Sequence, residues 1–291
     1  MLARMAHPTR SITLGDGTRI AYHEVGSGDP AIIFIHGAYS NRRGFGNQEE
    51  YFSPNHRCIA VDLRGHGDSD KPDQPLTMEQ HGHDVAELIE QLGLDRPVLV
   101  GQSMGGQVVI SVAALYPDLV TAVASLDSPS NIPGWHQRFH GPYDHLMTAD
   151  GPFRETVIAF LSAAYLPTDH PSRLGQMAER LAEVPDHVIL NSWAGKVGYD
   201  PTDILRAVRC PYLYIDCGQP DLDLGLLREL CSQVVIGKTV GAGHKALQDV
   251  PDQINAMLNR FVRHAEGIAA EMVRTGGVFR YNFPRDAGSP S

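Results

Sequence analysis

The sequence predicts an α/β fold with a mainly parallel eight-stranded sheet, helices on both faces and an inserted helical cap. Short apolar runs recur near both ends of the chain, and amphipathic helical patterns fall between the later runs. Strands that alternate with helices imply βαβ crossovers, which make neighbouring strands parallel. The runs expected to form strands are Ser11–Leu14, Arg19–Val25, Ala31–Ile35, Cys58–Val61, Val98–Val100, Val120–Leu126, Tyr212–Ile215 and Val234–Ile236.

Three stretches outside these runs have a helical spacing of apolar residues. The first covers Thr77 to Leu92, where Thr77 and Gln80 have the spacing of a capping box. A second helix is expected directly after Ser103, and the last begins near Asp252. The first two strands alternate more and lie close together in sequence, which suits an antiparallel hairpin at one edge of the sheet.

The rhythm of strands and helices divides the chain into a core, a cap and a tail. Residues 1–127 and 210–275 are expected to form the α/β core. Residues 128–209 are rich in Pro, His and aromatic residues and lack a clear strand, so they are expected to form a helical cap over the strand ends. The tail, residues 276–291, is expected to be irregular.

Composition excludes several classes of function. The chain has 291 residues, 34 acidic and 24 basic, for a net charge of −10, and no basic run occurs. This argues against nucleic acid and anionic membranes as partners, because both require clustered Lys and Arg. The beginning of the sequence lacks the apolar stretch of a secretory signal, and no long apolar run occurs, so a cytoplasmic protein is expected. The four cysteines are expected to be buried free thiols.

The stretch VLVGQSMGG places a serine between glycines directly after an apolar strand. A strand followed by G-x-S-x-G and a helix is typical of a nucleophile elbow, in which a strained turn raises the hydroxyl of Ser103 above the sheet. Gly101 and Gly105 fit the places where a side chain would collide with neighbouring elements. The amide of Met104, at the start of the helix, is placed to stabilise negative charge.

Three more motifs occur in a fixed order around this elbow. They are IHGA at residues 35–38, DLRGHGDS at 62–69 and GAGH at 241–244. Together with GQSMGG, this order resembles the α/β-hydrolase superfamily from about residue 12 to about residue 264. The resemblance implies a serine hydrolase of the esterase or lactonase kind with a helical lid.

The resemblance also implies roles for individual residues. Ser103 matches the nucleophile and His244 the general base that accepts the serine proton and returns it to the leaving group. The backbone amides of Ala38 and Met104 match the two donors of the oxyanion hole.

The acid that orients His244 has two candidates. Asp221 follows the run Tyr212–Ile215 in a G-x-x-D turn that resembles the place of the acid in most of the superfamily, but Gly218 comes one residue late. Asp127 follows the run Val120–Leu126 and resembles the position that a minority uses. Asp127 is favoured, with Asp221 as the alternative.

A serine nucleophile predicts attack on a carbonyl carbon and an acyl-enzyme that water releases. The predicted substrate is a medium-sized hydrophobic carboxylic ester or lactone. No cofactor or metal is expected; His136, His140 and His145 are unconvincing ligands because Pro142 interrupts any helix there. A homodimer is left open. The aromatic residues expected to bind substrate are Trp135, Phe139, Tyr143 and Trp193.

Other functions stay open at this point. An acyltransferase would use the same triad with another acceptor. A lyase or a cofactor-free oxygenase would use His244 as the essential base, with Ser103 only binding. A ligand receptor would keep the pocket without turnover.

Overall fold

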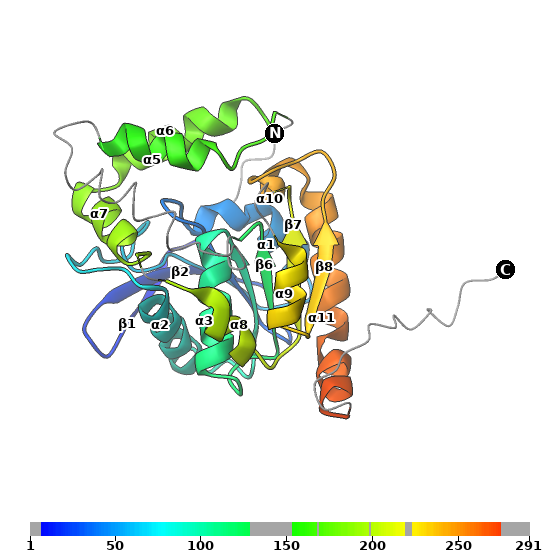
Figure 1. Cartoon of the computed structure of the whole chain (residues 1–291). Helices are drawn as coiled ribbons and strands as arrows, with labels where there is room; N and C mark the ends of the chain where they lie inside the picture. Colours follow the sequence, from blue (N-terminus) through cyan, green and yellow to red (C-terminus); the bar gives the residue numbers. More distant parts are fainter. Residues whose placement is uncertain (1–6, 129–152, 168, 198, 219–222, 275–291) are drawn as a thin grey trace.

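One eight-stranded sheet forms the centre of the molecule (Figure 1). The computed structural model describes residues 7–128, 153–167, 169–197, 199–218 and 223–274. The strands are β1 (Arg10–Thr13), β2 (Arg19–Val25), β3 (Ile32–Ile35), β4 (Cys58–Val61), β5 (Val98–Gln102), β6 (Ala122–Leu126), β7 (Tyr212–Asp216) and β8 (Val234–Lys238). Their order is β1-β2-β4-β3-β5-β6-β7-β8, with β1–β2 and β2–β4 antiparallel and every other pair parallel. The predicted fold class is confirmed.

The register of the parallel strands brings the segments that follow several strands together at the carboxyl ends of those strands. Ile35 of β3 pairs with Gly101 of β5, which pairs with Ser125 of β6. Because parallel strands point the same way, the segments that leave β3, β5 and β6 emerge side by side. The carboxyl ends of the strands are where ligands bind in open α/β sheets.

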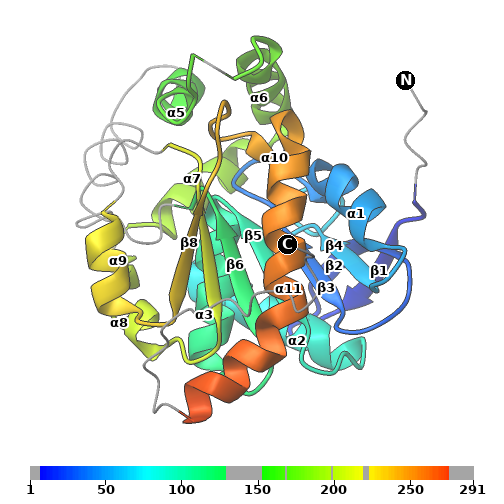
Figure 2. The ribbon, with the colours of Figure 1, turned by 90° about the vertical axis from the view of Figure 1, so that its right-hand side faces the viewer.

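Helices cover both faces of the sheet (Figures 1 and 2). One face carries α2 (Met78–Gln91), α3 (Met104–Leu115), α8 (Pro201–Ala207) and α9 (Leu224–Leu230), and the other carries α1 (Gly46–Phe52) and α11 (Pro251–Arg274). Leu205 and Val208 lie in the range predicted for the cap, yet they are buried in the core that the first group covers. Helix α8 therefore packs with the sheet-covering layer.

The start of α2 follows the predicted capping signal in part. The Thr77 side chain accepts a hydrogen bond from the Gln80 amide at 3.1 Å. The Gln80 side chain donates to Asp84 at 2.9 Å instead of reaching back to Thr77. One half of the capping box therefore forms.

The cap lies beyond the carboxyl ends of the strands (Figures 1 and 2). Its described helices are α5 (Phe153–Ser162), α6 (Ser172–Glu183) and α7 (Asp186–Ala194). A small apolar core of their own holds α5 and α7 against Tyr39. In the described part of the chain, no helix is long and apolar enough to cross a bilayer. All four cysteines are buried and free.

Candidate active site

The turn between β5 and α3 has the strained geometry that the glycine pattern predicts. Ser103 lies at φ 54° and ψ −120°, a conformation that L-residues rarely adopt. A Cβ on Gly101 would lie 2.1 Å from the Gly105 carbonyl oxygen, and one on Gly105 would lie 2.1 Å from the Ile35 carbonyl oxygen. Neither backbone atom can move aside cheaply, so both positions require glycine.

His244 and Asp127 meet beside this turn. The Ser103 amide donates to the Leu126 carbonyl at 2.9 Å, which places Ser103 next to the end of β6. Asp127 follows Leu126 and is 2% exposed, and its Oδ2 lies 2.7 Å from His244 Nδ1. Its Oδ1 accepts from the Cys217 amide at 3.3 Å. A buried carboxylate held in this way can fix the imidazole tautomer.

The other ring nitrogen of His244 faces the residue that precedes the serine. Gln102 Nε2 lies 3.2 Å from His244 Nε2 and donates to the His244 carbonyl oxygen at 3.1 Å. Because a carbonyl oxygen only accepts, the Gln102 nitrogen is a donor here and His244 Nε2 is its acceptor. The proton of neutral His244 then lies on Nδ1, facing Asp127. This is the tautomer that leaves Nε2 able to take up a proton.

Of the two acid candidates, only Asp127 can be placed. Asp221 lies outside the described residues. The 2.7 Å distance between His244 and Asp127 agrees with the preference for Asp127, and its catalytic role remains a prediction.

Two backbone amides near the elbow have no protein acceptor among the described residues. Met104 is the first residue of α3, and Ala38 follows the turn at the end of β3. Donors left open at a helix start and in an adjacent loop are what an oxyanion hole requires.

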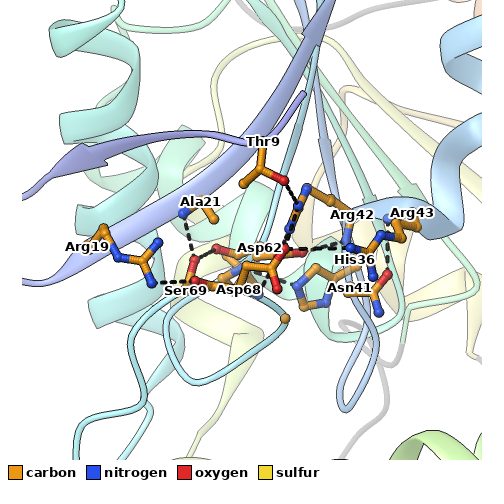
Figure 3. A network of polar contacts seen from close by, with 12 residues as sticks. Thr9, Arg19, Ala21, His36, Asn41, Arg42, Arg43, Asp62, Asp68 and Ser69 are labelled. Carbon is orange, nitrogen blue, oxygen red and sulfur yellow. Dashed lines mark hydrogen bonds and ion pairs between the residues drawn. The ribbon is translucent and has the colours of Figure 1, made fainter. Parts of the chain in front are cut away.

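A buried polar network holds the loop that carries Ala38 (Figure 3). Arg42 is 1% exposed and Asp62 is 0% exposed, and the Arg42 guanidinium forms an ion pair with Asp62. The same guanidinium contacts Asp68 at 2.7 Å and the Thr9 hydroxyl at 2.6 Å. His36 Nε2 accepts from the Leu63 amide at 3.1 Å. These contacts tie the loop after β3 to the DLRGHGDS segment.

His36 is neutral in this network. Burial is the main reason that the pKa of His36 is lowered to about 4. With Nε2 as an acceptor, its proton lies on Nδ1, which donates to the Gly37 carbonyl at 2.7 Å. His36 is therefore a structural part of its turn.

The cap contacts the loop that carries His244. Asp169 is buried, and its Oδ1 accepts from the Gly243 amide at 2.5 Å. The ring of Tyr165 lies 6.0 Å from the ring of His244. Arg173 of α6 pairs with Asp249 of α10 (Ala246–Asp249), with the Nε to Oδ1 distance at 2.8 Å. The cap and the histidine loop are thus joined by hydrogen bonds and an ion pair.

A pocket lies between the loop that carries Ala38 (residues 36–41, called the oxyanion loop after its predicted role), α6 and the histidine loop. Residues 38–40, four residues of α6, Lys245 and Gln248 line it, and its empty volume is about 300 Å³ including the open mouth. Arg173 and Arg180 are the two cations that α6 contributes. Burial first, and then the positive charges of Arg180 and Arg173, lower the pKa of Lys245 to about 8.

One of the aromatic residues predicted to bind substrate, Trp193, lies among the described residues. Trp193 is 1% exposed and packs in the cap core, with its ring 5.0 Å from that of Phe160. Trp193 is absent from the lining of the pocket beside Ala38, and it packs against Tyr39, which lines that pocket. Its role in substrate binding stays a prediction. The remaining predicted contacts and histidines lie outside the described residues: Trp135, Phe139, Tyr143, His136, His140 and His145.

Several residues at the site were not predicted from the sequence. Gln102 occupies the variable position of the elbow motif, and Lys245 directly follows His244, so both were within reach of motif reasoning. Asp169 and Arg180 reach the site only because the cap packs on the core. No local pattern in the sequence identifies them.

The profile of the family described as alpha/beta hydrolase fold matches residues 30–183, more than half of the chain. The chain therefore belongs to the α/β-hydrolase fold family. This agrees with the resemblance inferred from the four motifs.

Individual relatives cover less of the sequence. The chain is 39% identical over 119 residues to a 2-(acetamidomethylene)succinate hydrolase from Mesorhizobium japonicum. This match covers 41% of the chain and 42% of the relative, so the chain spans less than half the length of this curated relative.

Two solved structures match over most of the fold. One is a thermophilic esterase from Thermogutta terrifontis, with a TM-score of 0.76 and 22% identity, covering 89% of this chain and 99% of that one. The other is an N-acyl homoserine lactone degrading enzyme, with a TM-score of 0.76 and 24% identity, covering 87% and 100%. At these identities the likeness shows the fold alone.

Proposed function

We propose that the protein is a serine hydrolase that cleaves a carboxylic ester or lactone through an acyl-enzyme. The observation that carries this proposal is the contact between His244 Nδ1 and the buried Asp127 carboxylate at 2.7 Å, directly beside the strained turn that holds Ser103. Nucleophile, base and orienting acid are the three groups that this chemistry requires.

The first half of the reaction forms the acyl-enzyme. Ser103 Oγ attacks the carbonyl carbon while His244 Nε2 takes the hydroxyl proton, which requires Gln102 to yield its hydrogen bond to the ring. The negative charge on the carbonyl oxygen is stabilised by the amides of Ala38 and Met104, at about 3 to 4 kcal/mol for one such donor. The intermediate then collapses, the bond to the alkoxy group breaks, and His244 gives its proton to the departing oxygen.

The second half releases the acid. Water gives a proton to His244 Nε2 and its oxygen bonds to the acyl carbon. The bond to Ser103 Oγ breaks, and His244 returns the proton to the serine. The carboxylate of Asp127 stays ionised throughout and stabilises the imidazolium that forms at each step.

The relatives support acyl-bond hydrolysis as the class of reaction. One is named as a hydrolase, one structural neighbour as an esterase and another as a lactone-degrading enzyme. An ester or lactone carbonyl is therefore the proposed reacting group for this chain.

Labelling with a fluorophosphonate probe tests the nucleophile. We expect intact-protein mass spectrometry to find one adduct on wild type, none on Ser103→Ala and little on His244→Ala. A matched control is Ser125→Ala, in a buried hydroxyl of β6 that the mechanism does not use. Turnover that survives in Ser103→Ala would point instead to lyase or oxygenase chemistry, and ligand binding without turnover would point to a receptor.

A second experiment tests the acid. Asp127→Asn should lower kcat for 4-nitrophenyl esters by about 10⁴-fold, because the amide favours the wrong imidazole tautomer. Asp221→Asn is the matched control and should stay within a few-fold of wild type. The reverse pattern would transfer the role to Asp221.

Hydrolysis of the 4-nitrophenyl esters also distinguishes a hydrolase from an acyltransferase, because an acyltransferase excludes water from its pocket.

A further inference from the structure

Three cations surround the pocket beside the oxyanion loop. Arg173 and Arg180 come from α6, and Lys245 follows the histidine proposed as the base. The whole chain carries a net charge of −10, so a group of cations in one hollow is a local exception. Focused positive potential in a cleft attracts anionic ligands.

The three cations differ in how they are compensated. Arg173 is paired with Asp249, through Nε at 2.8 Å and Nη2 at 2.5 Å. Among the described residues, neither Arg180 nor Lys245 forms a hydrogen bond or an ion pair through its side chain. Asp127 and Asp169 act electrostatically on Lys245 without a hydrogen bond or ion pair to its side chain. Arg180 and Lys245, the two cations with no direct partner, line the same pocket.

The position of the pocket connects these charges with the proposed chemistry. Ala38, whose amide is the proposed oxyanion donor, lines the pocket together with Lys245. A ligand that fills the pocket therefore lies next to the oxyanion loop and the histidine loop. Burial is the main cause of the lowered pKa of Lys245, and the charges of Arg180 and Arg173 lower it further.

We propose that Arg180 and Lys245, supported by Arg173, form a subsite for a carboxylate of the substrate, so that the ester or lactone cleaved carries a free carboxylate. This inference rests on the proposed function. A planar guanidinium can bind a carboxylate through two parallel hydrogen bonds, and an ammonium adds a point charge. The neutral side chain of Gln248, also in the lining, provides a further donor.

Paired substrates test the subsite. The carboxylate can lie on the acyl side or on the leaving group. For the acyl side, mono(4-nitrophenyl) glutarate is compared with 4-nitrophenyl pentanoate, an uncharged ester with the same number of acyl carbons. For the leaving side, 3-(pentanoyloxy)benzoate is compared with its methyl ester. We expect wild type to prefer the anionic member of one pair at least tenfold in kcat/KM, and the pair that shows the preference identifies the side.

Variants connect the preference to the cations. Arg180→Met should reduce the anionic preference at least tenfold, and Arg180→Lys should restore part of it. The matched control is Arg206→Met. Arg206 is an exposed arginine of α8, which lies far from α6 (Figures 1 and 2), and its substitution removes the same charge. The control should keep the wild-type preference within twofold.

A binding measurement makes the test independent of turnover. Glutarate at 10 mM should raise the Tm of wild type and of Ser103→Ala relative to sodium chloride of equal ionic strength, and the shift should vanish in Arg180→Met. Absence of both the preference and the Tm shift would overturn the subsite. If the neutral esters are hydrolysed and Ser103 is labelled in that case, the proposed function survives. Failed labelling together with a glutarate shift would overturn the hydrolase and keep the anion site.

Discussion

Two arginines near the loop that carries Ala38 differ in their partners. Arg42, which follows Ala38 in the chain, is buried and bound to Asp62, Asp68 and Thr9 (Figure 3). Arg180, which lines the pocket together with Ala38, is half-buried and has no hydrogen-bond or ion-pair partner in the described structure. An arginine whose donors are satisfied internally holds a loop in place. An arginine with open donors beside a pocket is available to a ligand.

The energetic consequences of the two positions differ accordingly. Removing one partner of a buried ion pair leaves the other charge without compensation in a medium that solvates it poorly. Removing Arg180, which lines the pocket and has no ion-pair partner in the described structure, leaves no buried counter-ion without compensation. The same chemical group should therefore control stability at one position and selectivity at the other.

The largest expected effect is on the free energy of unfolding. Arg42→Met should lower it by about 3 to 5 kcal/mol, because the buried Asp62 carboxylate loses its counter-ion. Arg180→Met should lower it by less than about 1 kcal/mol. Urea unfolding followed by circular dichroism measures both. Equal losses of unfolding free energy in the two variants would contradict the different roles of Arg42 and Arg180.

The next effect is a pH dependence of the anionic preference. Lys245 is charged below its pKa of about 8 and neutral above it, so the preference should decline several-fold as pH rises from 7 to 9. Charged and titratable groups close to Lys245 come from several elements: Arg173, Arg180, Asp127, Asp169, His36, Asp249 and the preceding residue His244. The ratio of kcat/KM for the paired esters, measured across this range, cancels effects common to both substrates.

A lysine variant provides the control for that profile. In Lys245→Met the ratio should start lower and stay flat from pH 7 to 9, since Arg180 and Arg173 do not titrate there. A decline of the same size in this variant would assign the titration to another group.

The smallest expected effect has the opposite sign. Asp249→Asn keeps an oxygen that accepts from Arg173 but removes the one carboxylate that compensates it. The pocket becomes more positive, and the anionic preference should rise about two- to threefold. Asp203→Asn, in the exposed pair with Arg206 on α8, is the matched control. A fall in preference would mean that Arg173 needs Asp249 for its position more than the pocket needs positive charge.

The sequence predicted the features that depend on neighbours along the chain. All eight strands lie close to their expected places, because runs such as the fully buried β3 must be apolar on both faces. The elbow at Ser103 was predicted because its strain requires glycine at fixed spacings. Asp127 was also found from its place in the sequence, because it directly follows an apolar run that predicts a strand.

The cap shows where such reasoning stops. Trp193 and Arg180 are both large side chains on cap helices, yet one is buried in the cap and the other lines a pocket. Which of them faces the core depends on how α6 and α7 pack, and helix periodicity does not encode this. The contact between Asp169 and Gly243 likewise joins segments that are distant in sequence.

The attachment of the cap to the histidine loop has a mechanical consequence. Asp169 accepts a hydrogen bond from the Gly243 amide, and Arg173 forms an ion pair with Asp249 a few residues further on. Any outward swing of α6 must either rupture these bonds or drag the imidazole away from the hydroxyl it serves. Widening the entrance and keeping the proton acceptor in place are therefore competing demands on the same few residues.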